Sequence, residues 1–423
     1  MNNIKDLNLE NEILPLFDFT INKLAKEKLY KIFQEPLSAI EDIRSRQNII
    51  KGFITNEEVL RNYSYSKQDF YEVYKFLEEA PFKDYSKVSK FKYLFFKKEK
   101  EQLESKLIQL ILLFRALDLY YIRRNETRFF PDDYKRELIL LSDFFRSLNL
   151  DFYSKLENEG SFNTGHLVDF LNIISEKQSS GEFKIFYNRF LLFEVYVSIS
   201  KGVLKHQFCF PSFCEEALLL EDVYHPVLKN PVKNTFSSEK NVLLLTGPNM
   251  SGKSTFLKAV GICVYLAHLG IAIPASKAEI PFFDLISVSI NHQDDLLNGY
   301  SHFMNEIVRL REVVEAAANK RCFAVFDELF KGTNVEDAVQ ISATTINGLV
   351  QFKTSFFFIS THLHQLKEIE AIKQNHVDTY FVNCNIYNET PVFSYEIKKG
   401  WSDLKIGQIL FEKEGLNDLL RIK

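Results

Sequence analysis

The feature that most constrains this chain is a glycine-rich segment that lies between an apolar run at 242–246 and a helix-like run at 256–260. The segment consists of Gly247, Pro248, Asn249, Met250, Ser251, Gly252, Lys253, Ser254 and Thr255. Strand, glycine loop and helix in this order are typical of a phosphate-binding loop. In such a loop the glycines let backbone N–H groups turn toward phosphate oxygens, and the N-terminus of the helix adds positive potential. Lys253 is predicted to bind the β- and γ-phosphates of a nucleoside triphosphate, and Ser254 to bind Mg²⁺.

Composition limits the remaining possibilities. The 423 residues are enough for two or three domains, and the net charge of −4 provides no overall positive field for nucleic acid. The five cysteines form no C-x-x-C pair and the N-terminus has no signal-peptide pattern, so we expect a reducing, cytoplasmic location. Cys209 and Cys214 lie near His206, where a metal site and ordinary buried cysteines are the two alternatives. The longest apolar stretch, 259–275, contains polar and helix-breaking residues and is predicted to be core, with no membrane span.

The first half of the chain has a helical pattern. Apolar residues recur at helical spacing in 21–33 and again in 103–117. Pro36 is predicted to end the first of these helices, and a capping box at 38–41 is predicted to begin the next. We therefore expect an all-α domain over residues 1–214.

The second half alternates short apolar runs with helical stretches. The runs at 242–246, 322–326 and 355–360 are continuous, as in the strands of a parallel sheet that helices cover on both faces. Residues 215–423 are therefore predicted to form an α/β nucleotide-binding domain.

Two of these strands end in residues that suit phosphate chemistry. One ends in Asp327 and Glu328, of which Asp327 is predicted to hold Mg²⁺ and Glu328 to activate the attacking water. Carboxylates often close strands, so this interpretation depends on the phosphate-binding loop upstream. The other strand ends before Thr361 and His362, where the imidazole is predicted either to sense the γ-phosphate or to have a structural role.

Several motifs together resemble the MutS family of DNA mismatch-repair ATPases. The phosphate-binding loop has the family's narrower form, G-P-N-M-x-G-K-S-T. Residues 294–306 resemble the signature D-D-L-x-x-G-x-S-x-F-M-x-E, and 327–334 resemble D-E-x-x-[RK]-G-T-[ST]. Residues 224–228 resemble the R-H-P-V-[LV] strand that precedes the loop. The remaining matches, in family order, are 274–280, the Thr361-His362 pair and 395–407.

The resemblance implies an α/β P-loop ATPase domain of the ABC type, like MutS domain V, that follows an all-α core/lever domain. The chain departs from the family pattern in two expected ways. The helical span is short, so the clamp is expected to be reduced or absent, and no mismatch-recognition domain is expected before the lever. In this family two ATPase domains pair, and the signature serine of one subunit completes the site of the other. By this resemblance Ser301 would contact the γ-phosphate in the partner's site, Asn249 would help to hold phosphate and water, and His362 would sense the γ-phosphate. The resemblance therefore implies a homodimer that forms through the ATPase domains.

Two features of the helical half allow alternative interpretations. Phe70, in Asp69-Phe70-Tyr71-Glu72, resembles the family's Phe-x-Glu mismatch wedge, but it also fits one turn of a helix. The segment 82–106 interleaves lysines with aromatic residues, which suits either phosphate contacts or the solvated face of a charged helix.

The motifs lead to one functional hypothesis and one rival. We expect an ATP-dependent DNA-binding protein of the MutS family that hydrolyses ATP with Mg²⁺. Hydrolysis would switch a dimeric lever on DNA without mismatch selectivity. The rival is an ATP-gated remodeller that acts on a protein or ribosomal partner.

Overall fold

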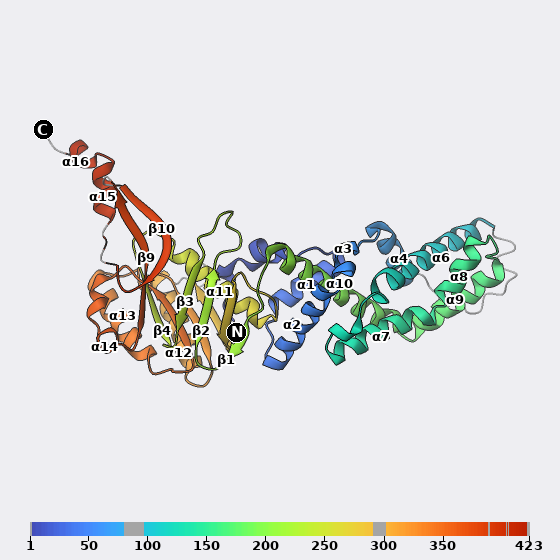
Figure 1. Ribbon diagram of the computed structural model, residues 1–423, viewed down its shortest axis with the longest axis horizontal. Helices are drawn as coiled ribbons and strands as arrows, with labels where there is room; N and C mark the ends of the chain where they lie inside the picture. Colours follow the sequence, from blue (N-terminus) through green and yellow to red (C-terminus); the bar gives the residue numbers. More distant parts are fainter. Residues whose placement is uncertain are drawn as a thin grey trace. The chain divides into compact units, whose positions relative to one another are not determined.

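The computed structural model describes residues 2–79, 97–290, 302–387, 390–402, 404 and 406–420 (Figure 1). The chain divides into two compact units. One unit comprises residues 16–35 and 44–205, and its described part is helical without any strand. The other comprises residues 1–15, 36–43 and 206–423 and contains both sheets. The predicted fold class, a helical region followed by an α/β region, is confirmed.

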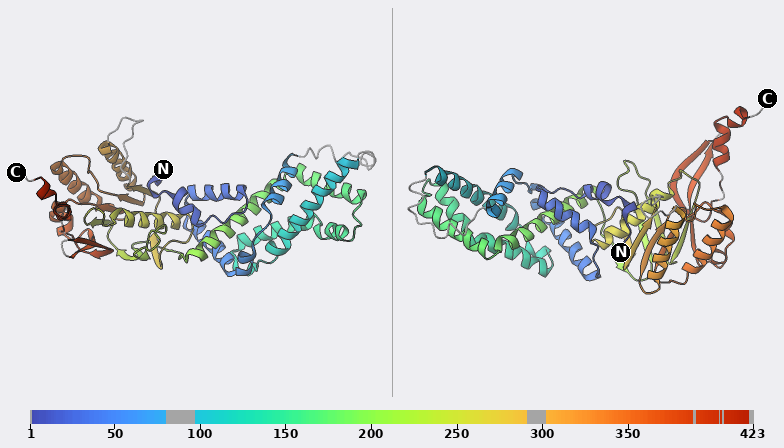
Figure 2. Two further views of the ribbon diagram at one scale, coloured as in Figure 1. Left: turned by 90° about the horizontal axis from the view of Figure 1, so that it is seen from above. Right: turned by 180° about the vertical axis from the view of Figure 1, so that it is seen from behind.

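The helical unit consists mainly of helices that lie lengthwise beside one another (Figure 2). Its main helices are α1 (Lys23–Gln34), α2 (Ile40–Thr55), α3 (Glu57–Asn62), α4 (Lys67–Glu79), α6 (Lys97–Leu117), α7 (Asp132–Ser147), α8 (Leu150–Asn158), α9 (Thr164–Ser179) and α10 (Glu182–His206).

Local signals explain where the first helix begins and which face it buries. The side chain of Asn22, the N-cap of α1, accepts a hydrogen bond of 2.9 Å from the backbone N–H of Ala25. Ala25, Leu29 and Phe33 recur every four residues and are buried, so one face of α1 packs into the core. The prediction of a helix from the spacing at 21–33 is correct.

Phe70 belongs to the core of the helical unit. It lies in α4 with only 2% of its surface exposed, and its ring packs 5.3 Å from that of Tyr65 and 5.8 Å from that of Phe190. A residue that intercalates between bases needs an exposed ring, so the wedge interpretation of Phe70 is wrong and the helical one is correct. Most of the lysine-rich segment, namely 82–96, lies outside the described residues.

A buried carboxylate joins three segments of the helical unit. Glu194 in α10 is fully buried, and its carboxylate accepts hydrogen bonds from the backbone N–H groups of Ile21 at 2.7 Å and Asn22 at 3.2 Å. It also accepts from the hydroxyls of Tyr63, at 3.1 Å, and Tyr65. Burial raises the pKa of Glu194, although these hydrogen bonds oppose the increase. The carboxylate therefore fixes the start of α1 and the loop before α4 against α10.

We expect Glu194→Ala to lower the free energy of unfolding of the helical unit by about 3 kcal/mol, because several buried donors lose their acceptor at once. Chemical unfolding followed by helix content measures the change. The matched control is Glu159→Ala, which removes an exposed carboxylate that forms a 3.8 Å ion pair with Lys155. The control should change stability by no more than about 0.5 kcal/mol. Equal effects of the two variants would contradict a stabilising role for Glu194.

The α/β unit contains a six-stranded and a four-stranded sheet (Figure 1). Its strands are β1 (Ser212–Cys214), β2 (Leu218–Val223), β3 (Asn234–Ser238), β4 (Val242–Thr246), β5 (Lys277–Pro281), β6 (Leu285–Ser289), β7 (Cys322–Phe326), β8 (Phe356–Ser360), β9 (Asp378–Tyr387) and β10 (Thr390–Lys399). Its helices are α11 (Lys253–His268), α12 (His302–Ala317), α13 (Val335–Leu349), α14 (Glu370–Lys373), α15 (Ile406–Lys413) and α16 (Leu416–Leu419).

The six-stranded sheet has the order β10-β9-β4-β8-β7-β6, and its strands from β9 to β6 are parallel. All residues of β4, β7 and β8 are buried, because layers cover both faces. Leu244, Ala324 and Phe357 face a core that includes residues of α12, α13 and α14. Phe358 faces the opposite way and packs 5.4 Å from Phe236 of the smaller sheet. The carboxyl ends of β4, β8 and β7 thus meet at one edge of the sheet.

The first residues of the chain complete the open edge of this sheet. Asn3 forms a parallel bridge with Ser287 of β6, and its backbone exchanges hydrogen bonds with Ile286 and Val288 at 3.0 and 2.7 Å. Leu7 is fully buried and would lie 2.9 Å from a Cβ atom placed on Gly261 of α11. Residues 1–15 therefore pack with the α/β unit, whereas the sequence pattern groups them with the helical domain.

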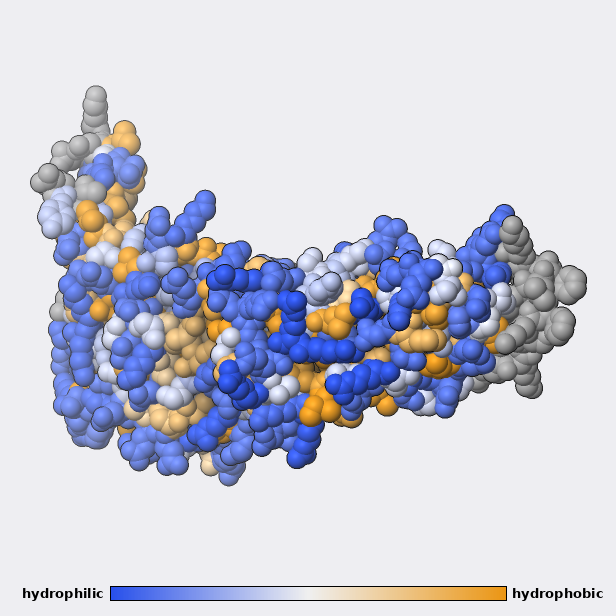
Figure 3. All heavy atoms as spheres, turned by 45° about the vertical axis from the view of Figure 1, so that its right-hand side comes forward, coloured by the Kyte–Doolittle hydropathy of each residue, from blue (hydrophilic) through white to orange (hydrophobic). Residues whose placement is uncertain are grey.

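The β9–β10 hairpin projects from the rest of the α/β unit and carries α15 beside it (Figures 1 and 2). Apolar surface extends along this projecting end (Figure 3). Its exposed apolar side chains include Ile386, Val392 and Phe411. Exposed apolar patches of this kind often mark contacts with other proteins.

Neither a membrane span nor a cysteine metal site occurs in the described residues. Within them, no helix is long and apolar enough to cross a membrane. No three His, Cys, Asp or Glu side chains gather there in a way that would hold a metal ion, and all five cysteines are free thiols. Cys209 instead pairs through its backbone with Ile273. The structure therefore favours ordinary cysteines over a metal site at Cys209 and Cys214.

A buried histidine ends α11. His268 is 1% exposed, and its Nδ1 and Nε2 atoms lie 2.7 Å from the carbonyl oxygen of Val264 and 2.8 Å from the backbone nitrogen of Phe283. A neutral imidazole satisfies both contacts, because Nδ1–H donates to Val264 while Nε2 accepts from Phe283. Burial lowers the pKa of His268 from 6.5 to about 4.

This shift predicts a pH dependence of stability. Because the folded-state pKa is lower than the unfolded-state value, the unfolded chain binds the proton more tightly, and stability falls as the pH falls from 6.5 to about 4. The loss attributable to His268 should approach about 3 kcal/mol at the low end. Urea unfolding at several pH values should therefore show a weaker pH dependence for His268→Gln than for the wild type. The exposed His376→Gln is the control, and an unchanged dependence in His268→Gln would contradict the assignment.

Candidate nucleotide site

The glycine-rich loop connects β4 to α11 and depends on its two glycines. Gly247 and Gly252 have φ angles of 138° and 98°, which residues with a side chain rarely adopt. A Cβ atom on Gly247 would lie 3.2 Å from the hydroxyl of Ser251, and one on Gly252 would lie 3.1 Å from the ring of Tyr395. The loop leads into the N-terminus of α11, whose first N–H groups favour a bound anion.

Lys253 lies beneath this loop. The side chain is 5% exposed, and its ammonium donates hydrogen bonds to the carbonyl oxygens of Gly247 at 2.9 Å and Pro248 at 3.1 Å. It also lies 3.9 Å from the carboxylate of Glu328. Burial lowers the pKa of Lys253, while Glu328 and Asp327 act in the opposite direction. The ammonium is thus held where phosphate oxygens would enter the loop.

Ser254 and Asp327 come together although they lie on different elements. The Ser254 hydroxyl, in the first turn of α11, donates a 2.5 Å hydrogen bond to Oδ2 of Asp327, which follows β7. The backbone N–H of Asp327 donates to the carbonyl of Ser289 at 2.9 Å, which holds the residue in line with β6. A hydroxyl and a carboxylate are hard oxygen donors of the kind that Mg²⁺ prefers. The residues present therefore fit a magnesium ion.

Glu328 occupies the same pocket in a strained backbone conformation. Its φ angle is 52°, in the left-handed region that is uncommon for residues other than glycine. Its Oε2 accepts a 2.5 Å hydrogen bond from the ammonium of Lys331. Burial alone would raise the pKa of Glu328, but Lys331 and Lys253 outweigh burial and hold the pKa below its usual value. The carboxylate is therefore ionised at neutral pH.

These residues surround one cavity. The phosphate pocket has a volume of about 550 Å³. Its lining includes Ser251, Gly252, Lys253, Ser254, Thr255, Asp327 and Glu328. Asn249 and Met250, at the exposed tip of the loop, also line it. Of the described loop and strand-end residues that the sequence predicts for this pocket, the structure thus brings together all except Gly247, Pro248 and His362.

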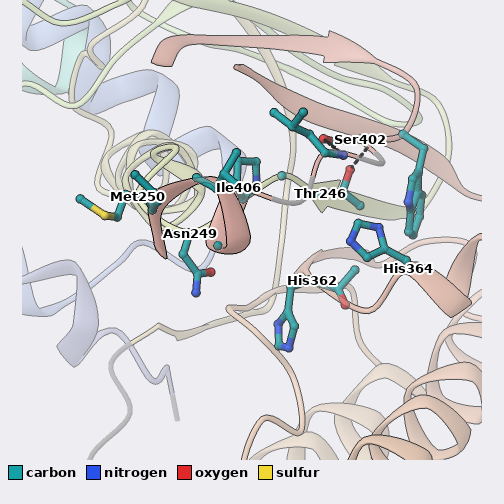
Figure 4. A pocket seen from close by; sticks show the side chains of 14 residues that line it. Thr246, Asn249, Met250, His362, His364, Ser402 and Ile406 are labelled. Atoms are coloured by element: carbon teal, nitrogen blue, oxygen red, sulfur yellow. Dashed lines mark hydrogen bonds between the residues drawn. The ribbon is translucent and has the colours of Figure 1, made fainter. Parts of the chain in front are cut away.

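Gly247, Pro248 and His362 line an adjoining pocket of about 270 Å³ that Asn249 and Met250 share. Asn249 and His362 extend in the same direction, from the loop and from the segment after β8 (Figure 4). Burial lowers the pKa of His362, with Glu328 acting in the opposite direction, so the imidazole is neutral at neutral pH. Ser301 lies outside the described residues.

A second adjoining pocket was not predicted from the sequence. It has a volume of about 380 Å³ and shares Gly252, Thr255 and Tyr395 with the phosphate pocket. Tyr395 lies in a bulge of β10, where the amide of Asn234 donates to its carbonyl oxygen at 3.0 Å. The lining also includes Tyr224, His225 and Leu228. Residues 224–228 form a turn after β2 and not the expected strand. Pro226 explains the difference, because it lacks the N–H group that a strand ladder needs.

Two further residues, to which the sequence analysis gave no role, contact the loop from Asp327 to Phe330, here called the carboxylate loop. Glu306 of α12 accepts a 3.1 Å hydrogen bond from the backbone N–H of Phe330, and burial raises the pKa of Glu306 to about 7. Ser360, at the end of β8, bonds to both Asp327 and Glu328. Glu306 stands in the signature-like segment, which could have drawn attention to it, whereas nothing in the sequence distinguishes Ser360 from other strand-end serines.

A strand, a glycine loop and a helix, with a carboxylate pair that follows β7, a parallel strand of the same sheet, define a P-loop nucleotide-binding domain. A family comparison agrees: residues 243–416 match the family model of MutS domain V. Residues 243–416 therefore belong to MutS domain V of the MutS family, which is an ATPase domain. The prediction of this family is confirmed.

Curated relatives show the extent of the likeness. A DNA mismatch repair protein MutS from Bacillus pumilus is 31% identical over 211 residues, which are 48% of this chain and 24% of that protein. A MutS from Fusobacterium nucleatum is 28% identical over 306 residues, which are 68% of this chain and 32% of that protein. The chain thus spans about a quarter to a third of the length of the curated relatives it matches.

Proposed function

We propose that this protein binds ATP with Mg²⁺ and hydrolyses it to ADP and phosphate. The observation that supports this proposal is the gathering of Lys253, Ser254, Asp327 and Glu328 around one pocket, next to the phosphate-binding loop. The loop and the N-terminus of α11 would hold the β- and γ-phosphates together with Lys253, and Ser254 and Asp327 would hold the metal. The pocket beside Tyr395 would receive the base and ribose, because it shares Gly252, Thr255 and Tyr395 with the phosphate pocket.

The chemical step would use Glu328. Its ionised carboxylate is suited to orient a water molecule and to accept a proton from it as the water oxygen attacks the γ-phosphorus and the bond to ADP breaks. Lys253 would exchange its hydrogen bonds with Gly247 and Pro248 for bonds to phosphate oxygens. A bound Mg²⁺ would neutralise charge on the phosphates. Neutral His362 and the amide of Asn249 would contact the γ-phosphate from the adjoining pocket.

The site would be complete only in a homodimer. By the family resemblance, Ser301 of one subunit would contact the γ-phosphate in the other. The exposed apolar side chains of the β9–β10 hairpin and α15 support association with a further chain (Figure 3).

DNA is the proposed target of the ATP-driven switch. The matching relatives are named DNA mismatch repair proteins. By the family resemblance, the helical unit would act as the lever. ATP binding and hydrolysis would change the arrangement of the paired subunits on duplex or branched DNA, without selectivity for mismatches.

Two substitutions separate binding from turnover. Glu328→Gln should bind ATP but lower kcat by about 10² or more, because it removes the group that accepts the proton. Lys253→Ala should weaken ATP binding about 10- to 100-fold, because it removes charge-assisted hydrogen bonds to phosphate. Phosphate release and equilibrium binding measure these effects. The control is Glu336→Gln, at an exposed position in the first turn of α13, and it should match the wild type. Normal turnover in Glu328→Gln would overturn its assigned role.

DNA binding is tested with the Glu328→Gln protein, which should accumulate the ATP state. Fluorescence anisotropy would compare plain duplex, mismatched duplex and four-way-junction DNA, with and without Mg-ATP, at two salt concentrations. We expect binding that requires ATP and weakens steeply with salt, because several phosphates are neutralised. If the protein retains ATP but binds none of these probes, the DNA proposal fails and a protein or ribosomal partner becomes the better hypothesis.

A further inference from the structure

Ser360 lies at the end of a central strand of the six-stranded sheet, where it contacts both carboxylate residues. It is the last residue of β8, the strand between β4 and β7, and it is fully buried. The regular pairing of β7 with β8 ends at Phe326 and Ile359. Beyond this pair, hydrogen bonds of the Ser360 hydroxyl link β8 to Asp327 and Glu328, the two residues that follow β7.

The hydroxyl contacts both carboxylate residues in different ways. It donates a hydrogen bond to Oδ1 of Asp327, and it accepts one of 2.8 Å from the backbone N–H of Glu328. Oδ2 of Asp327 is thereby turned toward Ser254, whose hydroxyl lies 2.5 Å away. One carboxylate oxygen is thus used for positioning, and the other faces the proposed metal site.

The second hydrogen bond acts where the backbone is strained. Glu328 has a φ angle of 52°, and non-glycine residues keep such a conformation only when their surroundings hold it. The bond from its N–H group to Ser360 is one such restraint, and it leaves the Glu328 side chain in the phosphate pocket. Ser360 itself does not line that pocket.

We propose that Ser360 is a positioning residue for ATP hydrolysis, which orients the Asp327 carboxylate toward the metal and fixes the backbone of Glu328. The proposal rests on the proposed ATPase function. Since Ser360 directly precedes Thr361 and His362, a displacement at the end of β8 would reach both carboxylate residues through this one hydroxyl.

The same strand provides a matched control. Ser355, immediately before β8, is also fully buried, and its hydroxyl accepts a 2.9 Å hydrogen bond from the backbone N–H of Cys322 at the start of β7. It also donates to the carbonyl of Lys320 at 3.4 Å. Ser355→Ala therefore removes a comparable connection between the same two strands at the end away from the phosphate pocket. Its effect on stability should resemble that of Ser360→Ala.

The test compares the wild type, Ser360→Ala, Ser360→Thr and Ser355→Ala in the full chain. Calorimetry with adenylyl imidodiphosphate would measure nucleotide affinity with Mg²⁺ and with EDTA, and phosphate release would give kcat and KM. For Ser360→Ala we expect unchanged affinity in EDTA, an approximately tenfold smaller gain in affinity from Mg²⁺, and an approximately tenfold or larger decrease in kcat. Ser360→Thr retains the hydroxyl and should restore much of both, and Ser355→Ala should match the wild type.

The outcomes distinguish this proposal from the function on which it rests. If Ser360→Ala resembles Ser355→Ala in both the Mg²⁺ effect and kcat, Ser360 is only structural and the proposal is overturned. Thermal unfolding of both alanine variants shows whether a loss of activity reflects a loss of the fold. If Ser360→Ala does not fold but Ser355→Ala does, the Ser360→Thr variant decides the question. A folded Ser360→Thr protein with normal kcat supports the proposal, and a folded one without turnover overturns it. A wild type that neither binds the nucleotide nor hydrolyses ATP would refute the proposed function itself.

Discussion

The alignment of three buried parallel strands is the constraint on which the site depends. Every residue of β4, β8 and β7 is buried, so these strands cannot slide or reverse without exposing a large apolar surface. Because their carboxyl ends lie at one edge, the segments that follow them meet: the glycine loop, Thr361-His362 and Asp327-Glu328. The chemistry of the site is therefore a consequence of hydrophobic burial in the sheet beneath it.

Charge balance around the phosphate pocket follows from the same arrangement. Lys253 and Lys331 both approach Glu328, and two serine hydroxyls donate to Asp327, so each buried charge has partners. A phosphate group that enters must compete with the carbonyls of Gly247 and Pro248 for the Lys253 ammonium. These existing contacts keep the ammonium in place and reduce the conformational entropy that binding must overcome.

Local patterns predicted much of this structure, and contacts between distant residues account for what they missed. The apolar runs at 242–246 and 322–326 coincide with β4 and β7, because a strand that is buried on both faces requires consecutive apolar residues. The contact between Glu194 and Ile21 joins residues 173 positions apart, and the packing of residues 1–15 on β6 joins the chain's start to its middle. No periodicity or motif encodes such pairings. Ser360 was missed for the same reason, since its role lies in its partners across the sheet.

The loop from Asp327 to Phe330 shows how elements outside the motifs determine the geometry of the site. Glu328 and Phe330 both have left-handed backbone conformations, with φ angles of 52° and 66°. Ser360 of β8 binds the N–H group of the first, and Glu306 of α12 binds that of the second. Each strained residue is therefore held by a different neighbouring element, as expected for backbone conformations that persist only where their surroundings restrain them. Since β8 leads to His362 and α12 begins within the signature-like segment, the two elements that restrain the carboxylate loop also adjoin, in sequence, the residues expected to contact the γ-phosphate.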